Sequence, residues 1–507
     1  MKKILCVFLA CIMLFGTLTA GTVSAAEDSY DHLPQIFVAG LGSRPVYYKD
    51  DPEKTSLFYP VETDRLIANV SNIDDYLLEA LLKRDYRLIY NLVYSFLWDS
   101  FGIIRMNPDG LTYSEELTMD PVKLSYKGDG YYEFNYDSRL GPVDIARQLN
   151  DYVAMVQEHS GSQRFELVGS SMGTAAVMAY LEMYPESRQY VDSVLLCVPS
   201  VEGVDFISEL FTGNFDVNAD NLHSFINLLA ANEDLDLFLA VLEKSGVLDL
   251  FVERALEPFM REALLNALMD ILRDIFATLP AAWSVVQPPE FYDALETMFG
   301  ENYADPDHEY AVLIDKVIYY QENVMKKARE LMTDWTAEGL KMNVVCKYGR
   351  PVVPLSKDGN VMSDGLVELE KSSFGATVAR FGEALPADYI QAEYPGYAFI
   401  SPDSAVDAST CALPFNTWFI KGLEHGTKND DYYELLDAVV YEDLDIFSSP
   451  EYPQFMEVSA EDDDRLIPMA EAERQRETGL ITDVVRLVLR ILSVVAEQIK
   501  KLTGQTL

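Results

Sequence analysis

The stretch from Phe165 to Pro185 (F-E-L-V-G-S-S-M-G-T-A-A-V-M-A-Y-L-E-M-Y-P) constrains the fold of this chain more than any other. Its first residues are mostly apolar, as in a buried parallel strand. An apolar run with helical spacing follows and ends at Pro185. Between the two lies Gly169-Ser170-Ser171-Met172-Gly173, a match to G-x-S-x-G. The stretch therefore predicts a strand, a sharp turn and a helix.

This succession is typical of the nucleophile elbow of α/β-hydrolases. The turn holds its serine in a strained backbone, and side chains beside it would collide with the strand and the helix. Gly169 and Gly173 remove those side chains. Ser171 would lie at the N-terminus of a helix, where developing negative charge is stabilised, so we expect it to be a nucleophile. The alternative is a glycine-rich strand-to-helix turn in another doubly wound fold.

Length and charge limit the class of protein. The chain has 507 residues, enough for a large core and one or two domains. It carries 82 Asp and Glu against 39 Lys and Arg, a formal net charge of -43. Phosphates would be repelled, so we expect no nucleic-acid partner. Electrostatic docking on anionic membranes is disfavoured for the same reason.

The N-terminus has the pattern of a secretory signal peptide. Lys2 and Lys3 give the charged region, and residues 4 to about 18 are apolar. Val23-Ser24-Ala25 is a small-residue cleavage site. A retained membrane anchor is the alternative interpretation. We therefore expect a bacterial protein that is secreted, or held at the cell surface after export.

Three cysteines remain beyond the signal peptide: Cys197, Cys346 and Cys411. An odd number leaves at least one thiol free or paired between chains. Cys197 and Cys346 lie in strand-like runs, which favours buried structural thiols. The sequence has no C-x-x-C, H-E-x-x-H or EF-hand pattern and no cofactor loop. We therefore expect neither a metal nor a cofactor.

Strand-like and helix-like runs alternate along much of the chain. This alternation predicts an α/β fold of the α/β-hydrolase type, with a mostly parallel sheet covered by helices on both faces. The helix before the elbow strand is predicted at Val143 to Glu158. Besides the elbow strand, the predicted strands are Gln35 to Ala39, Tyr131 to Asp137, Val191 to Val198, Asn343 to Tyr348 and Thr417 to Lys421.

Two helical blocks interrupt this alternation. The first is an insertion at about residues 50–127, in which Ile73 to Leu82 and Tyr86 to Trp98 are amphipathic. The second, at 200–340, lies between two strands, and we interpret it as a large helical cap that excludes water and shapes an acyl pocket. A helical domain without an active-site role is the alternative. The helical runs of the second block are Phe225 to Ala231, Leu235 to Glu243, Leu248 to Phe276 and Tyr310 to Leu331.

The last segment, Leu480 to Leu502, is dominated by apolar residues. Most of its polar residues fall three or four apart, so they line one face of an amphipathic helix. Arg486 and Arg490 argue against a membrane span. The helix either lies in a membrane interface or packs on the body of the protein, and we favour packing.

The predicted organisation follows from these segments. It comprises a signal peptide (1–25), the N-terminal part of the hydrolase core (26–199), the helical cap (200–340), the C-terminal part of the core (341–460), and an acidic linker with the C-terminal amphipathic helix (461–507).

Acyl transfer by a serine needs a general base, and histidine is the usual one at neutral pH. In α/β-hydrolases the chain order is serine, acid, histidine. His32 and His159 precede Ser171, and His223 and His308 lie in the cap. Only His425 follows the last predicted strand, so we expect it to be the base.

The acid of a triad should follow the strand near Val345. Asp364 in S-D-G-L-V is the preferred candidate, because an Asp-Gly turn lets the carboxylate project towards the imidazole. Asp358 in K-D-G-N-V is the runner-up. A Gly-rich turn after an early strand is where this fold places the second oxyanion amide, so we expect the amides of Leu41 and Met172 to bind the oxyanion. An ordinary strand-ending turn is the alternative.

These motifs together resemble those of the lecithin:cholesterol acyltransferase and lysosomal phospholipase family of α/β-hydrolases. The matching stretches, in the expected order, are V-A-G-L-G-S, N-Y-D-S-R, G-S-S-M-G, L-P-A-A-W-S-V-V, S-D-G-L-V and L-E-H-G. The resemblance implies Ser171, Asp364 and His425 as a triad, with Leu41 near the oxyanion.

The resemblance also implies a lipid acyl ester as the substrate, cleaved as by a lipase or phospholipase or transferred as by an O-acyltransferase. The cap and the C-terminal helix are the two candidate contacts with a lipid interface. A soluble carboxylesterase for small substrates is the main alternative. A non-catalytic binding protein on a hydrolase fold is the other.

Overall fold

The structure is a computed structural model that describes residues 32–41, 46–50, 86–112, 115–215, 258–352, 356–427, 429–442, 444–459, 465–474 and 476. Several predicted segments lie outside these residues. They are the signal peptide, the helical runs at Ile73 to Leu82, Phe225 to Ala231 and Leu235 to Glu243, and the C-terminal helix.

A nine-stranded sheet forms the centre of the molecule, in the order β15-β14-β13-β8-β7-β6-β1-β5-β4. Neighbouring strands from β5 to β14 are parallel, and only the edge strands β4 and β15 run antiparallel to their neighbours. The strands are β1 (Gln35–Val38), β4 (Tyr126–Gly128), β5 (Tyr131–Phe134), β6 (Phe165–Ser170), β7 (Val191–Cys197), β8 (Lys341–Tyr348), β13 (Thr417–Lys421), β14 (Phe455–Val458) and β15 (Leu466–Pro468).

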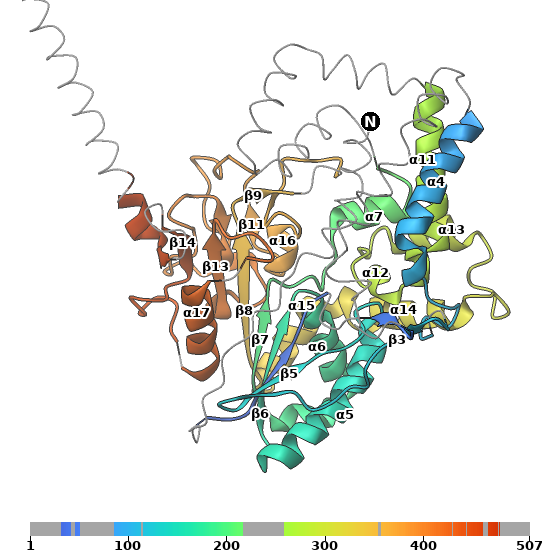
Figure 1. Cartoon of the computed structure of the whole chain (residues 1–507). Coiled ribbons are helices and arrows are strands. Elements are labelled where there is room, and N and C mark those ends of the chain that lie inside the picture. Colours follow the sequence, from blue (N-terminus) through green and yellow to red (C-terminus); the bar gives the residue numbers. More distant parts are fainter. Residues whose placement is uncertain are drawn as a thin grey trace, which may run out of the picture.

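Helices cover this sheet on both faces. Figure 1 shows α5 (Pro142–Ser160) and α6 (Met172–Met183) on one side and α17 (Asp430–Tyr441) on the other. Asn343 and Lys347 point to the same face of β8, and both contact α17, through the carbonyl of Val439 and the ring of Tyr432. The predicted α/β class, with its mostly parallel sheet, is confirmed.

Local sequence explains why these helices start and stop where they do. α5 begins with Pro142, whose ring fixes a helical φ and which needs no hydrogen-bond acceptor at that position. It ends at Gly161, which adopts the left-handed conformation (φ 71°) and donates to the carbonyl of Gln157. α17 begins after Asn429, whose side chain accepts the amide of Tyr432 at 2.8 Å.

The sheet continues beyond the last strand that the sequence predicts. Thr417 to Lys421 is β13, as expected, but β14 and β15 follow it and extend the same edge. These strands have four and three residues and lie in an acidic segment, so neither shows a long apolar run. Arg476 holds this edge through two hydrogen bonds to the carboxylate of Glu457, of 2.6 and 3.0 Å.

Between β7 and β8 the described residues are mainly helical, as the sequence predicts for the cap. The predicted run from Tyr310 to Leu331 is divided at Val324, where α14 ends and a 3₁₀ turn leads into α15. The helices of this block are α7 (Asp205–Phe211), α11 (Pro258–Asp274), α12 (Pro280–Trp283), α13 (Phe291–Phe299), α14 (Ala311–Asn323) and α15 (Ala328–Ala337).

The first insertion joins this block. Its helix α4 (Tyr86–Phe101) packs along α11, where Tyr90 and Tyr94 donate to Asp270 and Asp274 at 2.5 and 2.6 Å. The tyrosines stand four residues apart, as do their acceptors, so the bonds repeat along both helices. Among the described helices, none combines the length and apolar character needed to cross a membrane.

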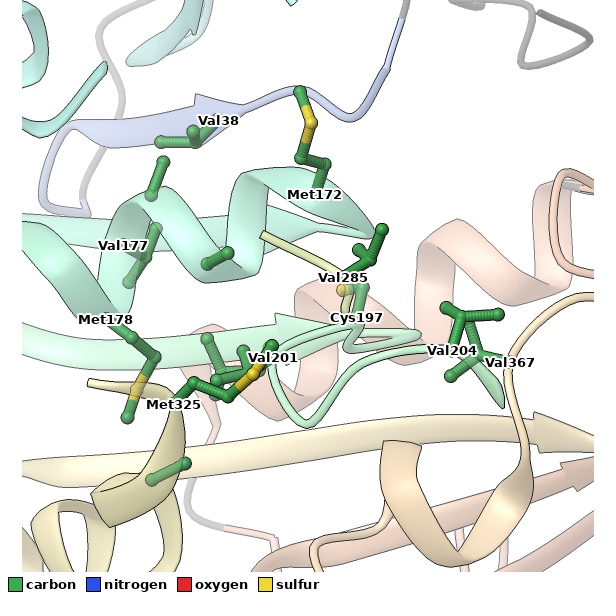
Figure 2. Close-up of a cluster of buried hydrophobic side chains, with 14 of the residues drawn as sticks. Val38, Met172, Val177, Met178, Cys197, Val201, Val204, Val285, Met325 and Val367 are labelled. Atoms are coloured by element: carbon green, nitrogen blue, oxygen red, sulfur yellow. The ribbon is translucent and has the colours of Figure 1, made fainter. Parts of the chain in front are cut away.

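The cap shares its apolar interior with the sheet. Figure 2 shows Val204 and Val285 from the cap segments in one cluster with Met172 and Val367 from the core. All four side chains are buried. The cap is therefore packed directly on the carboxyl ends of the strands, where ligands bind in open α/β sheets.

Candidate active site

The elbow predicted around Ser171 forms between β6 and α6. Ser171 is the single residue between the strand and the helix, with φ 53° and ψ -123°. A positive φ is uncommon for a residue with a side chain and marks local strain. The backbone amide of Ser171 donates to the carbonyl of Cys197 on β7 at 2.9 Å, which helps to hold the strained turn.

The two glycines of the motif are required by space. A Cβ on Gly173 would lie 2.2 Å from the carbonyl oxygen of Val38 and 2.6 Å from that of Ala39. A Cβ on Gly169 would lie 3.0 Å from the Cα of Thr174. The absence of these side chains lets α6 lie against the end of β1 and directs Ser171 out of the turn.

His425 lies in the loop that follows β13, and its ring reaches Ser171. Its Nε2 lies 2.8 Å from the Oγ of Ser171, and its Nδ1 lies 2.7 Å from Oδ2 of Asp364. An ionised carboxylate only accepts hydrogen bonds, so Nδ1 carries the proton and Nε2 is left to accept from the serine hydroxyl. This is the tautomer that a general base requires.

Asp364 is fixed in a tight turn, as the Asp-Gly pair predicts. Its Oδ1 accepts the amides of Leu366 at 3.0 Å and Val367 at 2.8 Å. The carboxylate is almost completely buried, and its backbone carbonyl accepts the amide of His425 at 2.8 Å. Backbone and side chain of Asp364 therefore both orient His425.

The runner-up Asp358 lies away from this site. Its side chain is half exposed and accepts from Arg380 at 2.7 Å. The Asp-Gly pairs at 358 and 364 look alike in sequence, but only the second one follows a strand pair, β9 (Arg350–Pro351) with β10 (Met362–Ser363), that brings it to His425.

The other described histidines have different partners. His159 contacts the hydroxyl of Tyr132 at 2.8 Å, His308 lies 3.3 Å from the carbonyl of Phe299, and the ring of His32 packs at a tilt against that of Tyr441. His223 lies outside the described residues. Of the histidines that the structure describes, only His425 contacts Ser171.

The two amides expected at the oxyanion lie on adjacent elements. Met172 is the first residue of α6, so its N–H has no acceptor four residues earlier within the helix. Leu41 follows β1, whose terminal carbonyls abut Gly173 of the same helix. Residues 42–45 of this turn lie outside the described residues. The oxyanion role of both amides remains a prediction.

Lys347, which the sequence did not single out, stabilises the loop that carries His425. Lys347 on β8 is buried, and its Nζ lies 4.2 Å from the centre of the Tyr432 ring. It donates to three carbonyls of the loop, those of Glu424 and His425 at 3.4 Å and that of Thr427 at 2.5 Å. A lysine directly after the apolar run Val344-Val345-Cys346 of a strand is the signal that could have revealed it.

The cysteines do not offer a competing nucleophile. Cys197, Cys346 and Cys411 are all buried, and within the described residues none of them forms a disulfide. Burial raises the pKa of Cys346 well above its usual range and that of Cys411 to about 12, so neither forms the reactive thiolate. Within the described residues, no group of three or more His, Cys, Asp and Glu side chains is placed to hold a metal ion.

A second segment of the resemblance joins the core to the cap. Arg139 and Asp137, in N-Y-D-S-R, form a buried pair with two hydrogen bonds of 2.9 and 2.7 Å. The carbonyl of Arg139 accepts the amide of Ala281 at 3.1 Å, and Gly141 lies against Pro280. The segments N-Y-D-S-R and L-P-A-A-W-S-V-V therefore lie side by side.

Comparisons with known proteins give a distant structural match and no match in sequence. Neither a protein-family model nor a curated protein matches the sequence. A solved structure described as the crystal structure of the Tle4-Tli4 complex is similar, with a TM-score of 0.28 and 11% identity. That match covers 63% of this chain and 75% of the other.

Proposed function

We propose that this chain is an exported serine hydrolase that cleaves or transfers the acyl groups of lipid esters. The observation that carries the proposal is the hydrogen-bonded line from Ser171 through His425 to Asp364, with distances of 2.8 and 2.7 Å. A nucleophile, a base in reach of it and a third group that orients the base are the signature of activated-serine catalysis.

The proposed reaction has two halves. The Oγ of Ser171 attacks the ester carbonyl while Nε2 of His425 takes the hydroxyl proton, and the amides of Leu41 and Met172 stabilise the oxyanion. Collapse of the tetrahedral intermediate breaks the ester bond, and His425 returns the proton to the departing alcohol. Water or an acceptor alcohol then attacks the acyl-enzyme and gives its proton to His425, which returns it to Ser171.

The lipid substrate is supported by the resemblance in sequence to the lecithin:cholesterol acyltransferase and lysosomal phospholipase family. The apolar cap that shares a core with the elbow is compatible with it, because such caps shield acyl chains and exclude water. Export is supported by the signal-like N-terminus. No cofactor or metal takes part in the proposed mechanism.

Product analysis on the mature protein tests the proposal. Phospholipid and triglyceride vesicles are offered with and without a long-chain alcohol, beside Ser171→Ala as the blank. Free fatty acid alone identifies a lipase or phospholipase, and a new ester in the alcohol samples identifies an acyltransferase. Turnover of short soluble esters only would replace the lipid assignment with a carboxylesterase. No turnover of any ester by the folded protein would favour a non-catalytic binding protein.

A further inference from the structure

Glu368 lies where the cap meets the turn that carries Asp364. It is four residues beyond Asp364, immediately before the short helix α16 (Leu369–Ser372), and its side chain is only 2% exposed. Its Oε1 accepts the backbone amide of Asp205, the first residue of cap helix α7, at 3.3 Å. One carboxyl group thus joins the acid turn to the cap.

Other contacts tie the same junction together. The side-chain amide of Gln287 donates to the carboxylate of Asp205, and its backbone amide donates to the hydroxyl of Ser208 at 2.9 Å. The amide of Val204 donates to the carbonyl of Val285 at 2.9 Å. The start of α7 and the segment after α12 therefore form one unit, and Glu368 attaches that unit to the core.

The second oxygen of Glu368 indicates the charge state. Its Oε2 is buried and has no hydrogen-bond partner in the described part of the chain. An ionised carboxylate with an unpaired buried oxygen is strongly disfavoured. The charged groups that face it are Asp205 on α7, which repels a negative charge, and Lys371 on α16, which attracts one. Burial, and then Asp205, raise the pKa of Glu368 well above its usual range.

The position of Glu368 connects this group to the triad. Ser363 pairs with Glu368 across the turn as an isolated bridge, so the two residues flank the segment 364–367. Within that segment the amides of Leu366 and Val367 hold Oδ1 of Asp364. A movement of Glu368 would therefore displace the donors that orient the triad acid.

We propose that Glu368 is a positioning residue, a neutral carboxylic acid that fastens the cap to the Asp364 turn and so keeps the triad aligned. This inference rests on the proposed function for its catalytic consequence only. The charge state and the positioning can be measured in the absence of turnover.

The first test is the pH dependence of the melting temperature of the mature protein. A group with a raised folded pKa contributes stability at low pH, and the contribution is lost as pH rises through that pKa. Glu368→Gln keeps the acceptor for the Asp205 amide and cannot ionise. From pH 5 to 9, wild type should lose about 2 °C or more relative to Glu368→Gln. The exposed neighbour variant Glu370→Gln should follow wild type. Parallel curves for wild type and Glu368→Gln would overturn the neutral state.

The second test measures the hydrogen bond between His425 and Asp364 directly. The proton that Nδ1 of His425 shares with Asp364 should give a low-field proton resonance in wild type and Glu368→Gln. Glu368→Ala should shift or broaden that resonance and lower kcat/KM about tenfold, with Glu368→Gln within about twofold of wild type. A folded Glu368→Ala with unchanged resonance and unchanged kcat/KM would show a merely structural role and overturn the positioning.

The two proposals can fail separately. If the protein turns over no ester, the melting curves and the resonance still decide the state and the role of Glu368. If Glu368→Gln and wild type have parallel melting curves, and Glu368→Ala leaves the resonance and kcat/KM unchanged while ester turnover depends on Ser171, the inference about Glu368 fails and the serine hydrolase proposal stands.

Discussion

The elbow around Ser171 and the outer cap, by which we mean helix α4 of the first insertion together with α11, differ in how they are held. The elbow is held by backbone groups, because the amide of Ser171 donates to the carbonyl of Cys197 and Gly173 lies against the carbonyls of Val38, at the end of β1, and of Ala39. In the outer cap, side chains do it, because α4 is fastened to α11 by bonds such as that from Tyr90 to Asp270. The elbow has no room for an added atom, whereas the outer cap can lose a single side-chain hydrogen bond and keep the others.

This difference shows which parts of the molecule require a fixed backbone conformation. A strained serine keeps its conformation only when the surrounding backbone determines it. A cap needs to cover the site and, in many enzymes, to move. We therefore expect changes at the elbow and triad to reduce activity severely, and changes in the outer cap to reduce stability slightly without changing activity.

The largest effect is expected for Ser171→Ala, which removes the proposed nucleophile. The rate of ester turnover should fall by about 10⁴- to 10⁶-fold, with an unchanged melting temperature. Ser170→Ala, at the preceding position on β6, is the matched control and should keep most of its activity. A Ser171→Ala protein with near wild-type turnover would place the chemistry elsewhere.

The second largest loss of activity is expected for Asp364→Asn. The asparagine amide cannot stabilise the imidazolium and favours the wrong tautomer of His425, so turnover should fall about 10⁴-fold. Asp358→Asn removes the same charge from the similar Asp-Gly turn and should leave turnover unchanged, because Asp358 is half exposed and its side chain contacts Arg380 and the amide of Asn360 rather than His425. The reverse result would exchange the roles of the two aspartates.

Gly173→Ala tests the backbone constraint itself. The added Cβ would lie 2.2 Å from the carbonyl oxygen of Val38, so the variant should lose about 3 kcal/mol of unfolding free energy. Denaturant unfolding measures this loss. Gly359→Ala is the control, because a Cβ there meets nothing within 4 Å. Equal stability of both variants would mean that α6 does not lie against β1.

Lys347→Met should have an intermediate effect. It removes the donor that binds three carbonyls of the loop carrying His425, so kcat should fall about tenfold while KM changes little. Lys341→Met alters the other end of the same strand, where Nζ donates to the carbonyl of Glu442 at 3.0 Å, and should retain full activity. Equal kcat values in the two variants would show that the contacts of Lys347 with the loop carrying His425 have no catalytic importance.

Tyr90→Phe should have the smallest effect. Burial and the hydrogen bond to Asp270 raise the pKa of Tyr90 to about 12, so the hydroxyl is a neutral donor at working pH. Its removal should cost about 1 kcal/mol of unfolding free energy and leave kcat/KM unchanged. Tyr319→Phe, on an exposed part of α14, should change neither quantity. A large loss of activity in Tyr90→Phe would contradict the contrast between cap and elbow.

The sequence predicts the interior of this fold better than its edges. Buried strands such as Val191–Cys197 and Thr417–Lys421 stand out because buried parallel strands contain continuous apolar runs. β14 and β15 were missed because an edge of a few residues gains its stability from pairing, which no local run displays. The pairing of α4 with α11 was missed too, because it joins residues 180 apart.

The site shows the same pattern. Ser171, Asp364 and His425 could be proposed from local turn chemistry and chain order, and the structure brings all three together. The roles of Lys347 and Glu368 could not, because the loop that Lys347 contacts and the helix that Glu368 contacts are 77 and 163 residues away in sequence. The neighbours of Lys347 and Glu368 in the chain give no hint of which loop or helix each side chain will contact.

The most direct test of the central claim is labelling of the mature protein with a fluorophosphonate, read by intact mass and by mapping of the modified peptide. We predict one adduct per chain, located on Ser171, lost in Ser171→Ala and strongly slowed in Asp364→Asn. A folded protein that takes up no label, or takes it up at another residue, would contradict the claim that Ser171 is an activated nucleophile.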